Sequence, residues 1–124
     1  MSDGNSLAAR FVRLQRAARG EPNPPQEVRA RRLRTLERML RDNADALADA
    51  VRGDFGHRSV AETRLLELFP CYAAISHALG HLRRWMRPQR RGVSLWFQPA
   101  RAEVRCQPLG AVGIIVPWNY PIYL

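Results

Sequence analysis

A chain of 124 residues with 46% apolar and 25% charged residues has the composition of one small globular domain. That composition excludes a chain that is disordered throughout its length, because such chains carry too few apolar residues to bury. The net charge of +9, carried by 20 basic residues that are all arginine, fits either an acidic partner or a coding bias toward arginine.

The first predicted helix covers residues 6–19 and ends at Gly20. Its apolar residues recur at helical spacing, which predicts a face packed on the rest of the protein: Leu7, Phe11, Leu14 and Ala18. Pro24 and Pro25 suit the start of a second helix, because a missing N–H costs nothing in the first turn. That helix is predicted to reach Gly53, with an apolar stripe formed by Leu33, Leu36, Leu40, Ala44, Leu47 and Val51.

A turn at residues 54–57 precedes a third predicted helix, which runs from Val60 to Met86. Its apolar stripe again steps by three and four: Leu65, Leu68, Tyr72, Ile75, Leu79, Leu82 and Met86. Pro70 lies inside this pattern and is expected to kink or split the helix. Two such stripes predict helices packed as antiparallel neighbours.

The character of the chain changes at Pro88. Residues 93–98 and 102–107 are predicted to form the two strands of a hairpin, separated by a turn at 99–101. Residues 111–116 are apolar on both faces and rich in β-branched side chains, which is typical of a strand inside a parallel sheet covered on both sides. Such a strand needs neighbours, so we expect the α/β domain to which it belongs to be incomplete in this chain.

Asn119 follows the predicted buried strand directly, between the two rigid residues Pro117 and Pro121. Ligands bind at the carboxyl ends of the strands in open α/β sheets, so this position favours a functional side chain. A structural asparagine that satisfies the turn or caps the following helix is the alternative from pattern alone.

Residues 108–121, PLGAVGIIVPWNYP, resemble the block shared by aldehyde dehydrogenases, in which a P-L-G-V-V-G strand leads into P-W-N-[FY]-P. Residues 54–59, together with Glu62 and Thr63, are similar to the coniferyl-aldehyde and class 3-like branch of that family. The helical segment before Pro88 also fits the N-terminal region of the family, so the resemblance covers most of the chain.

The resemblance implies an enzyme that oxidises an aldehyde to a carboxylic acid through a cysteine thiohemiacetal, with NAD or NADP as cofactor. Asn119 then matches the amide that donates to the carbonyl oxygen as negative charge develops there. Four residues match the lining of the cofactor cleft, with plain strand packing as the alternative for each: Ile115, Val116, Pro117 and Trp118.

The implied fold class is α/β. A helical region at 1–87 and an oligomerisation hairpin at 88–108 lead into residues 109–124, the first strand and helix start of an incomplete Rossmann-like NAD(P)-binding domain. In members of the family, the nucleophilic cysteine and the general-base glutamate occur later in the sequence than the segments that this chain matches. We therefore expect an inactive N-terminal fragment of a homo-oligomeric parent. Cys71 and Cys106 lack the nucleophile's sequence context.

The remaining candidates are weaker. Glu62 and Glu67 are interpreted as surface residues, and His77 and His81 as exposed residues with no third metal ligand, so no metal site is predicted. The two cysteines are too few for a disulfide framework, and no apolar stretch reaches the ~20 residues of a membrane span, so we expect a cytoplasmic protein. An arginine-rich nucleic-acid-binding module and a non-catalytic interaction protein are the alternatives; we expect no nucleic-acid partner, because aromatic residues do not interleave with the arginines.

Overall fold

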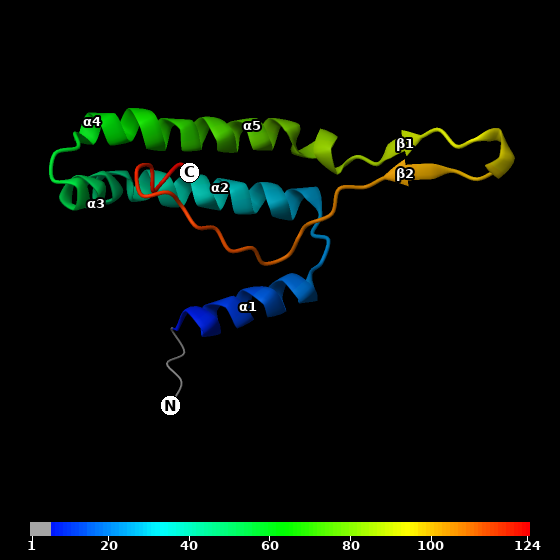
Figure 1. The fold of residues 1–124 in the computed structure, drawn as a ribbon, viewed down its shortest axis with the longest axis horizontal. Coiled ribbons are helices and arrows are strands. Elements are labelled where there is room, and N and C mark those ends of the chain that lie inside the picture. Colours follow the sequence, from blue (N-terminus) through cyan, green and yellow to red (C-terminus); the bar gives the residue numbers. More distant parts are fainter. Residues whose placement is uncertain (1–5) are drawn as a thin grey trace. The chain divides into compact units, whose positions relative to one another are not determined.

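The computed structural model describes residues 6–124 and divides the chain into two compact units (Figure 1). One unit comprises Met1–Gln26 and Arg83–Gly113, and the other comprises Glu27–Leu82 and Ile114–Leu124. The second unit holds the hydrophobic core, which is formed by six buried side chains: Leu40, Ala48, Val51, Leu68, Ile75 and Leu82.

The first unit opens with α1 (Leu7–Gly20), and the predicted bounds of this helix are confirmed. The Ser6 hydroxyl oxygen accepts a hydrogen bond from the Ala9 N–H at 3.2 Å, which caps the helix. The expectation that its apolar face is buried is wrong, because α1 contains no buried residue and Leu7 is 86% exposed.

The first unit also contains the predicted hairpin, but its first strand lies earlier than expected. β1 (Gln89–Arg91) pairs antiparallel with β2 (Ala102–Val104), while Leu95–Phe97 forms a 3₁₀ turn instead of a strand. In the observed register Arg90 lies opposite Glu103, and opposite charges across two strands stabilise the pairing. Apolar alternation could not identify this register, because nearly all the paired residues are exposed.

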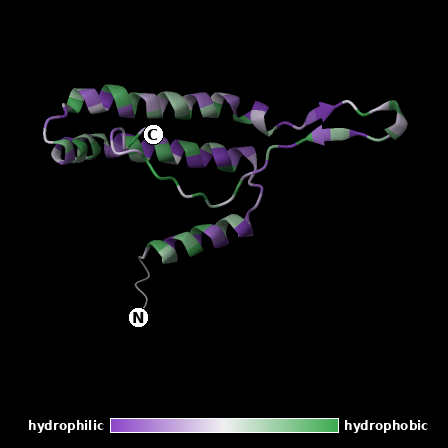
Figure 2. Cartoon of the chain, viewed as in Figure 1, coloured by the Kyte–Doolittle hydropathy of each residue, from purple (hydrophilic) through white to green (hydrophobic). Residues whose placement is uncertain are grey.

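The predicted strand at 111–116 is not observed, and no helix or strand is assigned between residues 105 and 117 (Figure 2). The expected burial on both faces is also wrong, since Ile114 is 75% and Ile115 is 99% exposed. A parallel strand exists only through the hydrogen bonds of neighbouring strands, and the described residues supply no such neighbour to this segment. The Rossmann-like part of the predicted fold is therefore absent from the described chain, which is mostly helical with a small antiparallel sheet.

The second unit is built from two helical rods. The predicted second helix is divided in two, α2 (Gln26–Asp42) and α3 (Ala44–Phe55), because Asn43 leaves the helical conformation and its side-chain amide donates to the Met39 carbonyl at 2.7 Å. Gly56 ends α3 with a positive φ of 74°, a conformation that favours glycine. The guanidinium of Arg41 on α2 lies 4.3 Å from the Tyr72 ring, so the two rods are in contact.

The third predicted helix is confirmed as one continuous rod from Val60 to Met86. It comprises α4 (Val60–Thr63), a π-helical segment (Arg64–Leu68) and α5 (Phe69–Met86). The Phe69 N–H donates to the Arg64 carbonyl in the π-helical i→i+5 pattern, directly before Pro70. The wider turn accommodates a residue that cannot continue the α-helical ladder, so the expected break takes the form of a π-bulge.

The π-bulge changes which side chains of this rod face the core. It inserts one residue into the turn, so the positions before Leu68 are rotated relative to a regular α-helix. Leu65, expected in the apolar stripe, is 64% exposed, whereas Thr63 and Glu67 are fully buried. The interpretation of Glu67 as a surface residue is therefore wrong.

Candidate functional site

Asn119 lies beside a pocket of about 250 Å³ in the second unit. Its lining combines the α3–α4 connection with the C-terminal segment: Phe55, His57, Arg58, Glu62, Asn119 and Tyr120. Asn119 itself is an exposed residue that lines this pocket. The turn at residues 118–119 that was predicted after Pro117 is observed.

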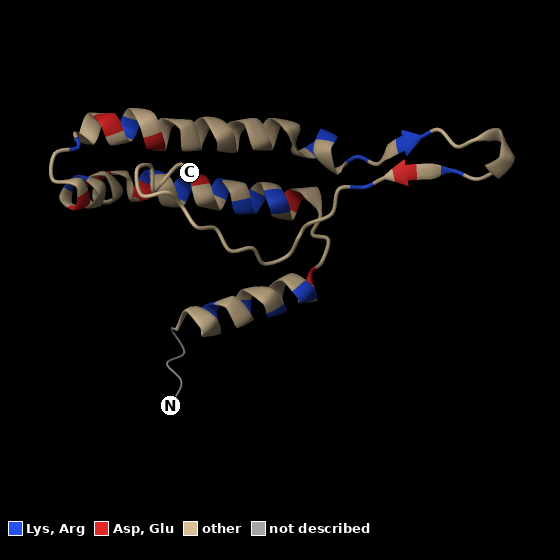
Figure 3. Cartoon of the chain, in the orientation of Figure 1, with Lys and Arg blue, Asp and Glu red and all other residues tan. Residues whose placement is uncertain are grey.

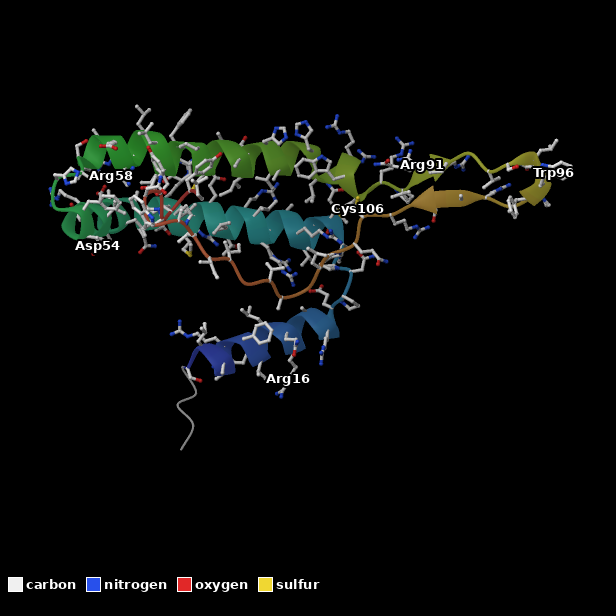
Figure 4. All side chains as sticks on the ribbon, in the orientation of Figure 1. Arg16, Asp54, Arg58, Arg91, Trp96 and Cys106 are labelled. Carbon is white, nitrogen blue, oxygen red and sulfur yellow. The ribbon has the colours of Figure 1, made fainter. Side chains whose placement is uncertain are left out.

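Arg58 lies in the α3–α4 connection (Figure 4). It binds the backbone of the Asn119 turn. Its Nη1 donates to the Asn119 carbonyl oxygen at 2.7 Å, although 61 positions separate the two residues. The guanidinium carbon lies 4.9 Å from the centre of the Phe55 ring and 4.7 Å from that of the Tyr120 ring, so aromatic rings contact the cation. The side chain is only 5% exposed, and such burial requires compensating partners.

Two carboxylates compensate the buried Arg58 cation. Glu62 Oε1 lies 3.3 Å from Arg58 Nε, and Glu67 Oε1 lies 3.2 Å from Arg58 Nη1. The second contact is an ion pair without hydrogen-bond alignment, since Glu67 Oε1 has no hydrogen-bond partner among the described residues. Glu62 remains exposed at the end of α4, as the sequence predicted, whereas Glu67 is fully buried. Its attraction to Arg58 is therefore screened very little by water.

The second carboxylate oxygen of Glu67 binds the backbone that follows Pro121. Glu67 Oε2 accepts a hydrogen bond from the Ile122 N–H at 2.7 Å and a longer one from the Tyr123 N–H at 3.4 Å. The turn at 121–123 thus begins on a carboxylate, as the first turn of a helix does when an acidic side chain caps it.

Cys71, one helical turn after Glu67, contacts the same segment. Its thiol donates to the Ile122 carbonyl at a sulfur–oxygen distance of 3.8 Å. Burial raises the pKa of the Cys71 thiol, and the negative charge of Glu67 raises that pKa further. The thiolate, which is the nucleophilic form, is therefore disfavoured at this position.

The four predicted cofactor-lining residues precede Asn119 in an irregular, largely exposed segment of the second unit. Ile115 is 99%, Val116 43% and Trp118 84% exposed, whereas Pro117 is half-buried. They offer a run of apolar surface immediately beside the Asn119 amide. A flat aromatic ligand that packs on this surface would remove it from water.

The remaining candidates gain no support as sites. The rings of His77 and His81 stack at 4.0 Å on α5, with His77 exposed and His81 half-buried. Within residues 6–124, no three histidine, cysteine or acidic residues converge as metal ligands. Cys106 is exposed and unpaired by any disulfide.

Sequence reasoning missed Arg58 and Glu67, the two buried charges that hold the Asn119 turn. A signal for Glu67 was present in Pro70, because a proline three residues later favours a bulge that rotates the preceding face. No local signal pointed to Arg58, whose partners are distant in sequence.

Comparison with known proteins identifies relatives along nearly the whole chain. The model of the "Aldehyde dehydrogenase family" matches residues 11–124. The chain is 44% identical over 120 residues to a probable coniferyl aldehyde dehydrogenase of Pseudomonas aeruginosa, covering 97% of the chain and 25% of the relative. It is 37% identical to a coniferyl aldehyde dehydrogenase of a Pseudomonas species, covering 95% of the chain and 24% of the relative. It is 36% identical to aldehyde dehydrogenase family 3 member B1 of Mus musculus, covering 97% of the chain and 25% of the relative.

The chain thus spans about a quarter of the length of these relatives. No solved structure matches it. These matches confirm the resemblance that residues 108–121 indicated, including the coniferyl-aldehyde and class 3-like branch.

Proposed function

The chain belongs to the aldehyde dehydrogenase family, and we propose that it forms the N-terminal part of an NAD(P)-dependent enzyme that oxidises an aldehyde to a carboxylic acid. The observation that carries this proposal is the Asn119 turn, in which an exposed asparagine lines a pocket and the turn's backbone is bound by two buried charged side chains. Two bacterial relatives are coniferyl aldehyde dehydrogenases by name, which favours an aromatic aldehyde of the coniferyl type as the substrate.

In the proposed reaction Asn119 is the catalytic residue of this chain. Its side-chain N–H donates to the aldehyde oxygen as that oxygen gains negative charge in the transition state. A neutral amide suits this role, because it donates without titrating and brings no charge that must be desolvated. Loss of one such donor lowers kcat by about 100- to 1,000-fold in comparable sites.

The nicotinamide cofactor, NAD or NADP, supplies the acceptor for the hydride that the aldehyde carbon loses. Ile115, Val116, Pro117 and Trp118 are the residues of this chain that would hold it. Their fit rests on the exposed apolar surface of Ile115 and Trp118, which a planar ring can cover. Their irregular, unpaired backbone also offers N–H and C=O groups to a ligand.

We further propose that the hairpin pairs with another subunit. Leu95, Trp96 and Phe97 are 82%, 91% and 68% exposed at its tip, and Trp96 points away from the strands (Figure 4). Exposed apolar clusters of this kind mark contact surfaces, and exposed strand edges invite pairing. The expected assembly is a homo-oligomer of the full-length enzyme.

The proposal is tested by replacing Asn119 in the full-length enzyme. We expect Asn119→Ala and the isosteric Asn119→Asp to lower kcat for aldehyde oxidation by about 100-fold or more, with little change in cofactor affinity. Asn43→Ala, the same substitution at a helix junction, is the matched control for effects on folding. Wild-type kcat in both Asn119 variants would overturn the assignment.

A further inference from the structure

We propose that Arg58 and Glu67 are positioning residues that set the place of the Asn119 amide, a role that rests on the proposed function of Asn119. The two side chains bind the turn on both sides of Pro121. Arg58 holds the carbonyl of residue 119, and Glu67 holds the N–H of residue 122. Arg58 Nη1 and Glu67 Oε1 are also 3.2 Å apart, so an ion pair connects the two side chains that bind the turn. We call this pair the Arg58–Glu67 clamp.

The clamp is rigid for reasons visible in its surroundings. Arg58 is 5% exposed and Glu67 is fully buried, so neither side chain exchanges its partners for water. The guanidinium contacts the rings of both Phe55 and Tyr120, and the carboxylate belongs to the π-helical segment Arg64–Leu68. Arg58 comes from the α3–α4 connection and Glu67 from the π-helical segment, and both bind a segment that has no regular hydrogen-bonded structure of its own.

A catalytic amide needs this external support. Residues 105–117 lead into the turn without helix or strand hydrogen bonds, so the backbone of Asn119 is otherwise restrained mainly by its flanking prolines. Transition-state donors act only within about 0.5 Å of their productive position. A displacement of about 1 Å caused by a distant substitution can lower the rate about 100-fold.

A purely structural role is the competing explanation, and a double-mutant cycle separates the two. If Glu67 acts through Asn119, then Glu67→Gln lowers kcat in the wild-type background but has no further effect when Asn119 is already alanine. If its role is purely structural, Glu67→Gln lowers the melting temperature. It then also lowers kcat by the same factor whether residue 119 is asparagine or alanine.

The experiment measures kcat, KM for the aldehyde and the melting temperature of the full-length enzyme carrying Glu67→Gln, Asn119→Ala or both. We expect Glu67→Gln to lower kcat by about 10- to 100-fold, and the double variant to match Asn119→Ala. Glu37→Gln is the matched control, because Glu37 forms an exposed ion pair with Arg41 on α2. Its kcat is expected to stay within about two-fold of wild type. If Glu67→Gln does not fold, Arg58→Lys keeps the charge but loses the planar fork, and enters the same cycle.

The outcomes distinguish the clamp from the proposed function. Wild-type kcat in Glu67→Gln, or an equal loss in both backgrounds, overturns the clamp while a large loss in Asn119→Ala still supports the enzyme assignment. Wild-type kcat in Asn119→Ala overturns the assignment instead. In that case amide hydrogen exchange of Ile122 still decides whether the clamp exists. Its protection must fall in Glu67→Ala, which removes the accepting oxygen, and persist in Glu37→Ala, and unchanged protection in the former overturns the clamp.

Discussion

Glu67 and Ile122 lie 55 positions apart, yet the carboxylate of the first accepts a hydrogen bond from the backbone N–H of the second at 2.7 Å. This contact joins the π-helical segment of the second unit to the turn that presents Asn119. It places a fully buried negative charge beside an irregular segment of the chain. The charge is tolerated there because Arg58 and the backbone N–H groups of residues 122 and 123 compensate it.

We expect Glu67→Ala to destabilise the folded protein by about 3–5 kcal/mol, because it leaves a buried guanidinium and a buried N–H without their shared partner. Glu37→Ala, which breaks an exposed pair with Arg41, is expected to cost less than about 1 kcal/mol. Denaturant unfolding of the two variants measures both values. Similar losses of unfolding free energy in Glu67→Ala and Glu37→Ala would show that the buried ion pair contributes no more to stability than the exposed one.

The π-bulge predicts opposite outcomes for two neighbouring leucines. Leu68 is 2% exposed, so Leu68→Ala is expected to lower the free energy of unfolding by about 2–5 kcal/mol through lost burial and a residual cavity. Leu65 is 64% exposed, and Leu65→Ala should change it by no more than about 0.5 kcal/mol. Thermal unfolding of the two variants measures these changes. A larger loss of unfolding free energy in Leu65→Ala than in Leu68→Ala would show that Leu65 faces the core, as in a regular α-helix.

Cys71 predicts a loss of stability in alkaline solution. Burial and the Glu67 charge raise the pKa of its thiol, so the folded state keeps a proton that the unfolded state releases above the ordinary thiol pKa of about 8.5. The unfolded state then binds fewer protons. This contribution to stability is therefore complete below that pH and is lost as the pH rises toward the folded-state pKa. The difference in unfolding free energy between wild type and Cys71→Ala, followed against pH, measures it; a difference independent of alkaline pH contradicts the prediction.

The 124-residue chain by itself is expected to have no aldehyde dehydrogenase activity. Asn119 and residues 115–118 supply an oxyanion donor and an apolar surface, but the raised pKa of Cys71 makes its thiol a poor nucleophile. Incubation of the purified chain with NAD or NADP and an aldehyde measures this directly. Reduced cofactor formed above the background without protein would refute the expectation.

Specific binding to nucleic acid is not expected, despite the net charge of +9. Both arginines and acidic residues lie on α2 and α3 (Figure 3). Three arginines of the second unit are paired with nearby carboxylates: Arg41 with Glu37, Arg52 with Asp49, and Arg64, in the π-helical segment, with Asp45. Affinity for duplex DNA should be no tighter than about 10⁻⁶ M at physiological salt, the range of non-specific binding. A titration at two salt concentrations checks this, and tighter binding that weakens steeply with salt would favour the nucleic-acid alternative.

Several elements could be predicted from local sequence because local physics decides them. Ser6 and Gly20 bound the first helix, and the apolar residues Leu68, Ile75 and Leu82 repeat at the spacing that places them in the core. The family followed from residues 108–121, where three prolines, a tryptophan and an asparagine occur in a fixed order. These features depend on neighbours within a few positions, and the chain carries that information directly.

The placement of strands and of buried charge could not be predicted in the same way. Residues 93–98 have strand-like composition, yet β1 forms at 89–91, where Arg90 lies opposite Glu103 in the hairpin register. Likewise, the apolar run at 111–116 looks like a buried strand but has no partners among the described residues. A strand is a property of at least two segments, so composition alone does not determine where it forms.

The sequence by itself therefore determined where most of the helical segments lie, the core positions Leu68, Ile75 and Leu82, and the family motif around Asn119. Only the tertiary structure decided that Glu67 faces inward and that Arg58 and Glu67 bind the Asn119 turn from both sides. The physical reason is range. Helical periodicity acts over three or four residues, whereas these hydrogen bonds join groups 55 and 61 positions apart and form only when packing brings the helices and the C-terminal segment together.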